Sequence, residues 1–248
     1  MDISFQLYSA RNEASLPQTL KALREIGYTQ VEGWGAQFGD PAALVAMLHD
    51  ADLAMPTAHI GLQVLADPAA ALRIADTVGV STVYCPFLAQ EDRSADSDGW
   101  RRLGGRLNSI AEAFAREGKG LGWHNHDFEF KPTGDGKLPM DLLLDAAPAL
   151  QWEMDVAWVV RGGEDPVKWI DARGDRITAV HVKDIAKAGE ALDEDGWADV
   201  GHGTLDWPGL LAKIKARSKA RYFVAEHDKP KDAMRFARRS MDSLRKWM

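Results

Sequence analysis

The sequence predicts a single (β/α)8 barrel of the TIM type that occupies residues 1–248 as one domain. Short apolar segments rich in Val, Ile, Tyr and Phe recur along the chain, and each is followed by an amphipathic segment rich in Ala, Leu, Arg and Glu. The alternation runs through eight repeats without a linker, and 248 residues match the usual length of one such barrel. Unbroken alternation of this kind predicts parallel strands, and eight repeats predict closure.

Each predicted element has its own signal in the sequence. The expected strands lie at 3–8, 29–34, 54–59, 81–86, 120–126, 150–156, 177–183 and 222–227. The expected helices lie at 16–26, 40–51, 67–78, 98–117, 138–146, 166–172, 207–216 and 231–246. Helix starts are marked by an aspartate N-cap before a proline at Asp40-Pro41, Asp67-Pro68 and Asp165-Pro166. Helix ends are marked by glycine at Gly27, Gly79 and Gly118.

A doubly wound open sheet is the alternative fold, because it also alternates strands and helices. The sequence shows no phosphate-binding loop typical of that fold, since Gly33-Trp34-Gly35 and Gly201-His202-Gly203 lack the full dinucleotide pattern. The longest polar loop, 187–199, follows the strand at 177–183, where a lid or a partner contact is expected.

Composition and charge narrow the classes of partner. The net charge of −7, from 30 basic and 37 acidic residues, argues against a strong hold on nucleic acid or an anionic membrane. Cys85 is the one cysteine, so no disulfide can form within the chain. The sequence has no run of 18 apolar residues, and its start lacks the basic region of a signal peptide. We therefore expect a cytoplasmic protein with neither a nucleic-acid nor a membrane partner.

Residues that commonly bind metals gather where four of the expected strands end. Because side chains alternate along a strand, Asp155, His181 and Glu226 can all point into the barrel near its C-terminal rim. His124 and His126 share one face of the strand at 120–126, and Glu129 follows three residues later. This mixture of oxygen and imidazole donors suits Mn, Co, Fe, Mg or Zn, and the lack of thiolates excludes a site for soft metals.

Longer motifs around these residues point to a family. They are Trp123-His124-Asn125-His126-Asp127-Phe128-Glu129-Phe130, Trp152-Glu153-Met154-Asp155-Val156, Val180-His181-Val182-Lys183-Asp184, Val200-Gly201-His202-Gly203-Thr204-Leu205-Asp206-Trp207 and Val224-Ala225-Glu226-His227-Asp228. With them the chain resembles the xylose isomerase-like TIM-barrel family of sugar phosphate isomerases and epimerases, which also contains inosose dehydratase. The resemblance implies one divalent metal ion, held by Glu129, Asp155, His181 and Glu226.

Two departures from the family pattern affect the expected site. Many relatives have a glutamate within the strand where this chain has His124, so the first ligand is either Glu129 or one of the histidines His124 and His126. Many relatives also have a histidine three residues after the strand aspartate, and this chain has Trp158 there. The more aromatic substrate face resembles the branch that acts on 3-keto-glucosides and related keto-sugars.

These residue types fit proton abstraction next to a carbonyl of a small sugar or polyol, through an enediolate stabilised by a divalent metal. His124 or His126 could act as the base near neutral pH, and the resemblance offers Glu129 and Glu226 as competing base and acid. Lys183 lies one inward step beyond His181, where it can neutralise an alkoxide or orient a hydroxyl. The expected substrate contacts are His59, Trp34, Trp123, Trp158 and Lys183.

Other functions stay open at this level. The same enediolate serves a lyase, either a dehydratase similar to inosose dehydratase or an enzyme that cleaves 3-keto-glycosides by β-elimination. A metal-dependent phosphodiesterase would need more histidines than seven and a basic face, and the net charge of −7 counts against it. A non-catalytic sugar-binding barrel would be expected to have lost at least one of the four ligand types. Because family members commonly associate, the resemblance also allows a homo-oligomer.

Several neighbouring polar residues have structural interpretations. Glu32, at an expected strand end, suits an internal ion pair, and His227, which faces away from Glu226, suits packing against a helix. Asp184 fits a surface polar cluster or an orienting partner of His181.

Overall fold

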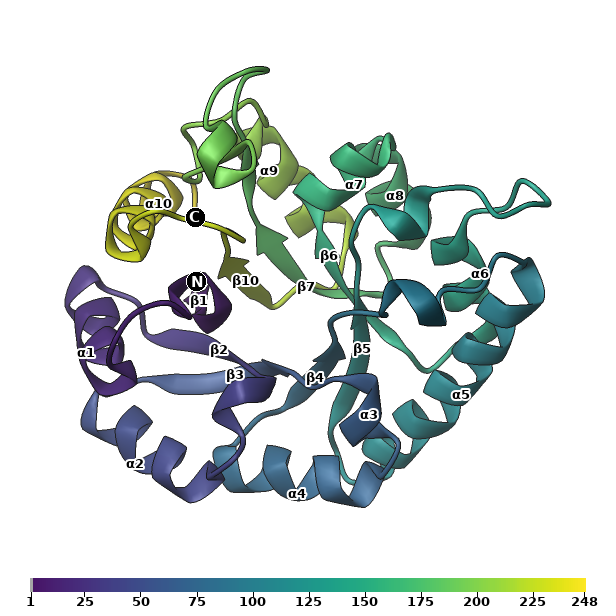
Figure 1. Cartoon of the computed structure of the whole chain (residues 1–248), viewed down its shortest axis with the longest axis horizontal. Coiled ribbons are helices and arrows are strands. Elements are labelled where there is room, and N and C mark those ends of the chain that lie inside the picture. Colours follow the sequence, from purple (N-terminus) through teal and green to yellow (C-terminus); the bar gives the residue numbers. More distant parts are fainter. Residues whose placement is uncertain (1) are drawn as a thin grey trace.

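The computed structural model describes residues 2–248 and contains a ring of strands surrounded by helices (Figure 1). The eight parallel strands form a closed barrel in the order β1-β10-β7-β6-β5-β4-β3-β2. They are β1 (Ile3–Gln6), β2 (Gln30–Trp34), β3 (Ala54–His59), β4 (Thr82–Cys85), β5 (Gly120–His124), β6 (Gln151–Asp155), β7 (Ile177–Val182) and β10 (Tyr222–Ala225). Strand β1 pairs with both β2 and β10, so the predicted (β/α)8 barrel is confirmed and the open sheet is excluded. Met1, with which the predicted domain begins, lies outside the described residues.

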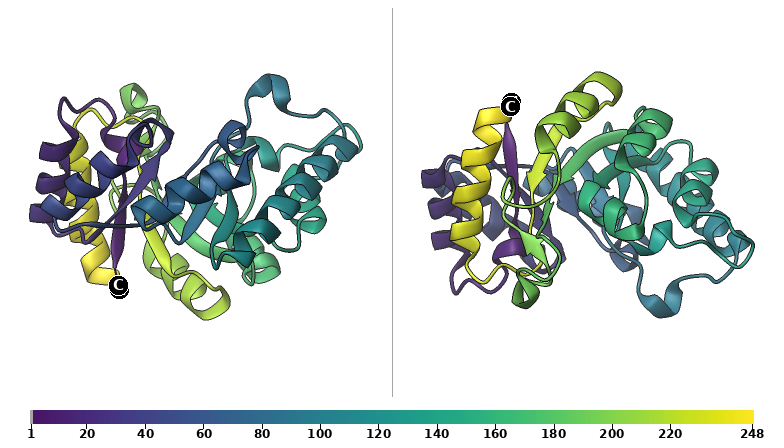
Figure 2. Two further views of the ribbon diagram at one scale, coloured as in Figure 1. Left: turned by 90° about the horizontal axis from the view of Figure 1, so that it is seen from below. Right: turned by 90° about the horizontal axis from the view of Figure 1, so that it is seen from above.

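The outer layer of helices follows the predicted segments closely. These helices are α1 (Leu16–Ile26), α2 (Pro41–Asp50), α4 (Pro68–Val78), α5 (Ser97–Arg116), α6 (Pro139–Ala146), α8 (Pro166–Arg173), α9 (Trp207–Arg217) and α10 (Ala233–Trp247). The predicted caps are present, since the side chains of Asp40, Asp67 and Asp165 each accept a backbone N–H of the helix that follows. Helix α10 lies beside α1 in both views of Figure 2, which closes the ring of helices.

Several short elements follow the ends of barrel strands and were not predicted. They are the helices α3 (Leu62–Leu65) and α7 (Val156–Gly162), the antiparallel pair β8 (Asp184–Ile185) and β9 (Trp197–Ala198), and the 3₁₀ turns η1 (Leu7–Ala10), η2 (Gly35–Gln37), η3 (Gln90–Asp92), η4 (Phe128–Phe130) and η5 (Leu192–Glu194). The polar loop predicted at 187–199 therefore holds η5 and β9. Within residues 2–248, no helix is long and apolar enough to cross a membrane.

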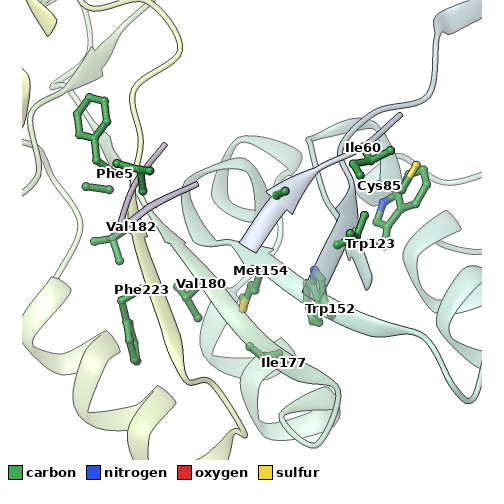
Figure 3. Close-up of a cluster of buried hydrophobic side chains, with 14 of the residues drawn as sticks. Phe5, Ile60, Cys85, Trp123, Trp152, Met154, Ile177, Val180, Val182 and Phe223 are labelled. Carbon is green, nitrogen blue, oxygen red and sulfur yellow. The ribbon is translucent and has the colours of Figure 1, made fainter. Parts of the chain in front are cut away.

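The hydrophobic core lies mainly between the barrel and the helices. Figure 3 shows buried side chains of this layer, among them Trp123 on β5, Trp152 on β6 and Phe223 on β10. Trp123 lies beside Cys85, its register partner on β4. Burial of these large side chains provides the main driving force for closing the ring.

The inside of the barrel is polar, although such barrels are usually filled by branched apolar side chains. The buried inward residues include Gln6, Glu32, Thr57, His59, His124, Glu153, Asp155 and His181, and Glu226 follows the end of β10. Burying charged groups is unfavourable unless they are paired or bind a metal. The polar interior therefore marks the functional end of the barrel.

Candidate metal centre

Four buried side chains meet at the carboxyl ends of neighbouring strands. They are His124 at the end of β5, Asp155 at the end of β6, His181 on β7 and Glu226 directly after β10. Each offers one ligand atom, and these atoms all lie within 4.8 Å of one another. Strand register explains the meeting, because Asp155 pairs with His181 and His181 pairs with Val224, two residues before Glu226.

Asn125 fixes the position of Asp155. Its Oδ1 accepts the backbone N–H of Asp155 at 3.0 Å and the indole N–H of Trp152 at 2.9 Å, while its amide nitrogen donates to the Asp155 carbonyl at 3.1 Å. The Asp155 carboxylate also caps α7 by accepting the backbone N–H of Trp158 at 2.9 Å. Burial raises the pKa of Asp155 to about 6 against the opposing effect of Lys183, so this carboxylate gains from a nearby cation.

The two ring nitrogens of His181 face different carboxylates. Nδ1 lies 2.9 Å from Glu226 Oε2, and Nε2 lies 2.7 Å from Glu32 Oε1. Glu32 Oε1 also accepts a hydrogen bond from Gln6 at 2.8 Å, which leaves Glu32 as the acceptor for an N–H of His181. A carboxylate behind a histidine commonly fixes the tautomer that binds a metal. Nδ1 is then free to bind a cation together with Glu226, and Glu32, for which the sequence suggested an internal ion pair, is a buried hydrogen-bond partner of this imidazole.

Lys183 is fully buried among three carboxylates. Its ammonium lies 2.5 Å from Asp228, 3.1 Å from Glu226 and 3.5 Å from Asp155. It also stands 4.4 Å from the ring centroid of Trp197. Because these partners occupy it, Lys183 neutralises part of the acidic group and is held in one position.

The residues present fit a divalent cation. Five carboxylates are buried or largely buried: Glu32, Glu153, Asp155, Glu226 and Asp228. Within residues 2–248, Lys183 supplies the one ammonium that pairs with them. A buried excess of negative charge needs compensation by cations or protons. The donors are carboxylate oxygens and imidazole nitrogens, which suit Zn, Mn, Fe or Co.

A cavity of about 430 Å³ opens above this centre. His124, Glu226 and Asp228 form part of its wall, and aromatic side chains form another part: Tyr8, Trp34, Phe87 and His126. Two of the predicted substrate contacts, Trp34 and His59, line it. Burial, with a further contribution from Lys183, lowers the pKa of His126 to about 3, so this imidazole is neutral. Among residues 2–248, Nδ1 of His126 has no hydrogen-bond partner.

Glu129 and Trp123 lie outside the ligand group and the cavity wall. This corrects the predictions that Glu129 is a metal ligand and that Trp123 contacts the substrate. Trp123 follows the outward face of β5 and is fully buried against the helices. Its indole N–H donates to Glu129 Oε1 at 2.8 Å, and the backbone N–H of His126 donates to Glu129 Oε2 at 2.9 Å. These bonds hold the Glu129 carboxylate outside the ligand group, and burial raises its pKa to about 8. Of the alternatives for the first ligand, the structure brings His124 to the other three.

The remaining predicted residues occupy supporting positions. Trp158, on α7, packs 5.2 Å from the ring of His126 and 4.8 Å from that of Trp197, behind the cavity wall. His227 packs against Phe236 of α10 at 5.4 Å, as expected for a residue that faces a helix.

Asp184 organises the loop that follows β9. It is fully buried, and its carboxylate accepts the backbone N–H groups of Ile185, Gly201, Gly203 and Leu205. It is therefore neither a surface residue nor a partner of His181. At Gly203 a Cβ atom would lie 2.2 Å from the Asp184 carboxylate, so a glycine is required there.

We expect Asp184→Ala to lower the free energy of unfolding by about 2–4 kcal/mol, because it leaves several backbone N–H groups without an acceptor. Asp206→Ala is the matched control, since Asp206 accepts the single N–H of Gly209 at the start of α9. The control should cost about 1 kcal/mol. Urea unfolding of both variants measures the difference, and equal losses would show that Asp184 does not organise the loop.

Sequence reasoning missed several residues of the site. Glu153 shares the inward face of β6 with Asp155, so period-two spacing could have identified it, whereas Asp228 lies at a bend beyond the end of β10, where strand spacing does not apply. Tyr8 lines the cavity from η1, although it was expected within the strand at 3–8, and Phe87 lines it from the segment that follows β4, just after the expected strand at 81–86.

Comparison with solved structures supports the fold. A sugar phosphate isomerase/epimerase from Parabacteroides distasonis has a TM-score of 0.82 and 22% identity, with 98% of this chain and 93% of that chain covered. The probable 3-DHS dehydratase AsbF of Bacillus anthracis has a TM-score of 0.76 and 18% identity, with 99% of both chains covered. The protein IolI, solved with a bound zinc atom, has a TM-score of 0.78 and 12% identity, with 100% of this chain and 99% of that chain covered.

The family of the chain follows from its sequence. No curated protein matches the sequence. Residues 20–247, nearly the whole barrel, match the family described as xylose isomerase-like TIM barrel. The chain belongs to the xylose isomerase-like TIM barrel family.

Proposed function

We propose that the protein is a divalent-metal-dependent isomerase or epimerase that abstracts the proton α to the carbonyl of a keto-sugar or related polyol. The observation that carries this proposal is a neutral imidazole, His126, in the wall of the same cavity as His124 and Glu226 of the ligand group. A cation held by His124, Asp155, His181 and Glu226 would supply Lewis-acid polarisation of the carbonyl.

His126 is the best placed proton acceptor. A general base must be unprotonated and must reach the substrate. Its lowered pKa meets the first condition, and its place in the cavity wall with an unpaired Nδ1 among residues 2–248 supports the second. Glu226 is the competing base, but its Oε2 already lies 2.9 Å from His181 and 3.1 Å from Lys183.

The cavity wall supports a sugar as the substrate class. Tyr8, Trp34 and Phe87 present aromatic surface on which the C–H face of a sugar can stack. Tyr8 and Trp34 pack edge to face at 5.2 Å, which holds this wall in place. Glu226 and Asp228, which line the same cavity, can accept hydrogen bonds from hydroxyl groups.

A lyase is the second candidate. After the same proton abstraction by His126, departure of a β-oxygen would give dehydration or cleavage of a 3-keto-glycoside. The fold similarity to a probable dehydratase supports elimination as the second candidate reaction.

Proton exchange tests the proposal. We expect the metal-loaded protein to incorporate deuterium from D₂O at the α-carbon of one member of a panel of ketoses, keto-inositols and 3-keto-glycosides, with NMR and mass spectrometry as the readout. His126→Phe keeps an aromatic ring but removes the base, and should slow the exchange about 10²- to 10⁴-fold. His202→Phe is the matched control, because His202 lies in an exposed loop outside the cavity lining. Unchanged exchange in His126→Phe would contradict the assigned base.

A further inference from the structure

A second group of ligand atoms lies beside the metal centre, deeper in the barrel. Oε2 of Glu153 is 2.6 Å from His59 Nε2, 3.1 Å from His124 Nδ1 and 3.2 Å from His181 Nε2. The four ligand atoms of this group lie within 4.8 Å of one another, and all four side chains are buried. They come from β3, β5, β6 and β7, so rigid strands of the barrel fix their positions.

Two carboxylate oxygens at this group have no partner. Within the part of the chain that the structure describes, Oε1 of Glu153 and Oε2 of Glu32 are buried without any hydrogen bond. Glu32 adjoins the group, because its Oε1 lies 3.2 Å from His59 Nε2. Unpaired buried carboxylate oxygens are costly, and a bound cation is a common way to satisfy them.

The net charge of the buried carboxylates around both groups also favours a bound cation. Its five carboxylates (Glu32, Glu153, Asp155, Glu226 and Asp228) and the ammonium of Lys183 leave four negative charges when the histidines are neutral. Arg161 is not counted in this sum, because its guanidinium covers the ring of Trp197 and donates to the carbonyl of Asp195. One divalent cation would compensate two of the four charges, and two divalent cations would compensate all four.

We propose that the barrel binds a second divalent cation, from the group Zn, Mn, Fe and Co, through His59, His124 and Glu153. With two cations bound, the ligand set of the proposed function changes at one residue: His124 binds the deeper cation through Nδ1, and Asp155, His181 and Glu226 hold the cation nearer the cavity. Nε2 of His181 continues to donate to Glu32. Each site then has three protein ligands of mixed oxygen and nitrogen type, with further positions left for water or substrate.

Protons are the competing way to balance the charge. Burial alone would lower the pKa of His59, but the carboxylates of Glu32 and Glu153 outweigh it and raise this pKa to about 9. An imidazolium at His59 would pair with Glu153, whereas a second cation would displace that proton. Metal stoichiometry separates the two arrangements.

The test is equilibrium dialysis of the purified full chain against Zn²⁺ or Co²⁺, with metal content measured by mass spectrometry. We expect two equivalents in the unmodified protein and one in each of two single variants, Glu153→Gln and His59→Gln. The affinity of the deeper site should fall more than about 100-fold in both variants, since loss of an outer-shell partner alone costs 10- to 100-fold. Asp155→Asn should also retain one equivalent, and the double variant with Glu153→Gln should retain none.

Glu129→Gln is the matched control, because Glu129 is a buried carboxylate outside both groups. It should keep two equivalents, and circular dichroism verifies that every variant is folded. One equivalent in the unmodified protein, or two equivalents in folded Glu153→Gln and His59→Gln, would overturn the second site. If that single equivalent disappears in Asp155→Asn, the proposed function stands while the second site fails. No bound metal at all would contradict both.

Discussion

Asp155→Asn is expected to weaken cation binding nearest the cavity more than about 100-fold, and to remove proton exchange with it. The substitution removes the charge of a carboxylate that lies among His124, His181 and Glu226. Asparagine is as good an N-cap as aspartate, so the hydrogen bond to the N–H of Trp158 can be kept and α7 need not unfold. Calorimetric titration with Mn²⁺ or Zn²⁺ measures the change in affinity.

Asp165→Asn provides the matched control for this variant. Asp165 caps α8 in the same way, through the N–H of Val167 at 2.9 Å, but it lies outside the ligand group. It should leave cation affinity unchanged. Equal affinity of the unmodified protein and Asp155→Asn would show that Asp155 is not a ligand.

Lys183→Met is expected to lower the free energy of unfolding of the metal-free protein by about 3–5 kcal/mol. Methionine has a similar length and can pack against Trp197, so the main loss is the charge that pairs with Asp155, Glu226 and Asp228. The three carboxylates would then repel one another in a buried place. Urea unfolding in the presence of a chelator measures this loss, and a saturating divalent cation should restore part of it.

Lys229→Met is the control for the lysine variant. Its ion pair with Asp195 at 3.0 Å is more than half exposed on both sides, so the loss should stay under about 1 kcal/mol. A loss for Lys183→Met as small as that of the control would mean that the acidic cluster is compensated by protons or by other groups.

The fold could be predicted from the sequence because its signals are local and repeated. Each Asp-Pro pair marks a helix start through one side-chain hydrogen bond and one fixed dihedral angle, and these signals act within four residues. The short helix α7 was not predicted, since Asp155 serves both as the last residue of β6 and as the cap of α7. The β8–β9 pair was also missed, because its strands have two residues each and no alternation to detect.

The candidate site could be predicted in part. Asp155, His181 and Glu226 were identified because strand periodicity places all three on the inside of the barrel. Glu129 was assigned to the same group through a family pattern, but the direction of its side chain depends on a hydrogen bond from Trp123 on the other face of β5. Such a contact lies beyond strand periodicity, so only the three-dimensional structure shows that His124 takes the place nearest the other ligands.

The most direct measurement is an anomalous difference map from crystals of the full chain grown with Mn²⁺ or Zn²⁺. We predict a peak within ligand distance of Asp155, His181 and Glu226, at the end of the cavity that His126 lines. Absence of that peak at full loading, or a peak bound by the Glu129 carboxylate in its place, would contradict a metal centre at the mouth of this barrel.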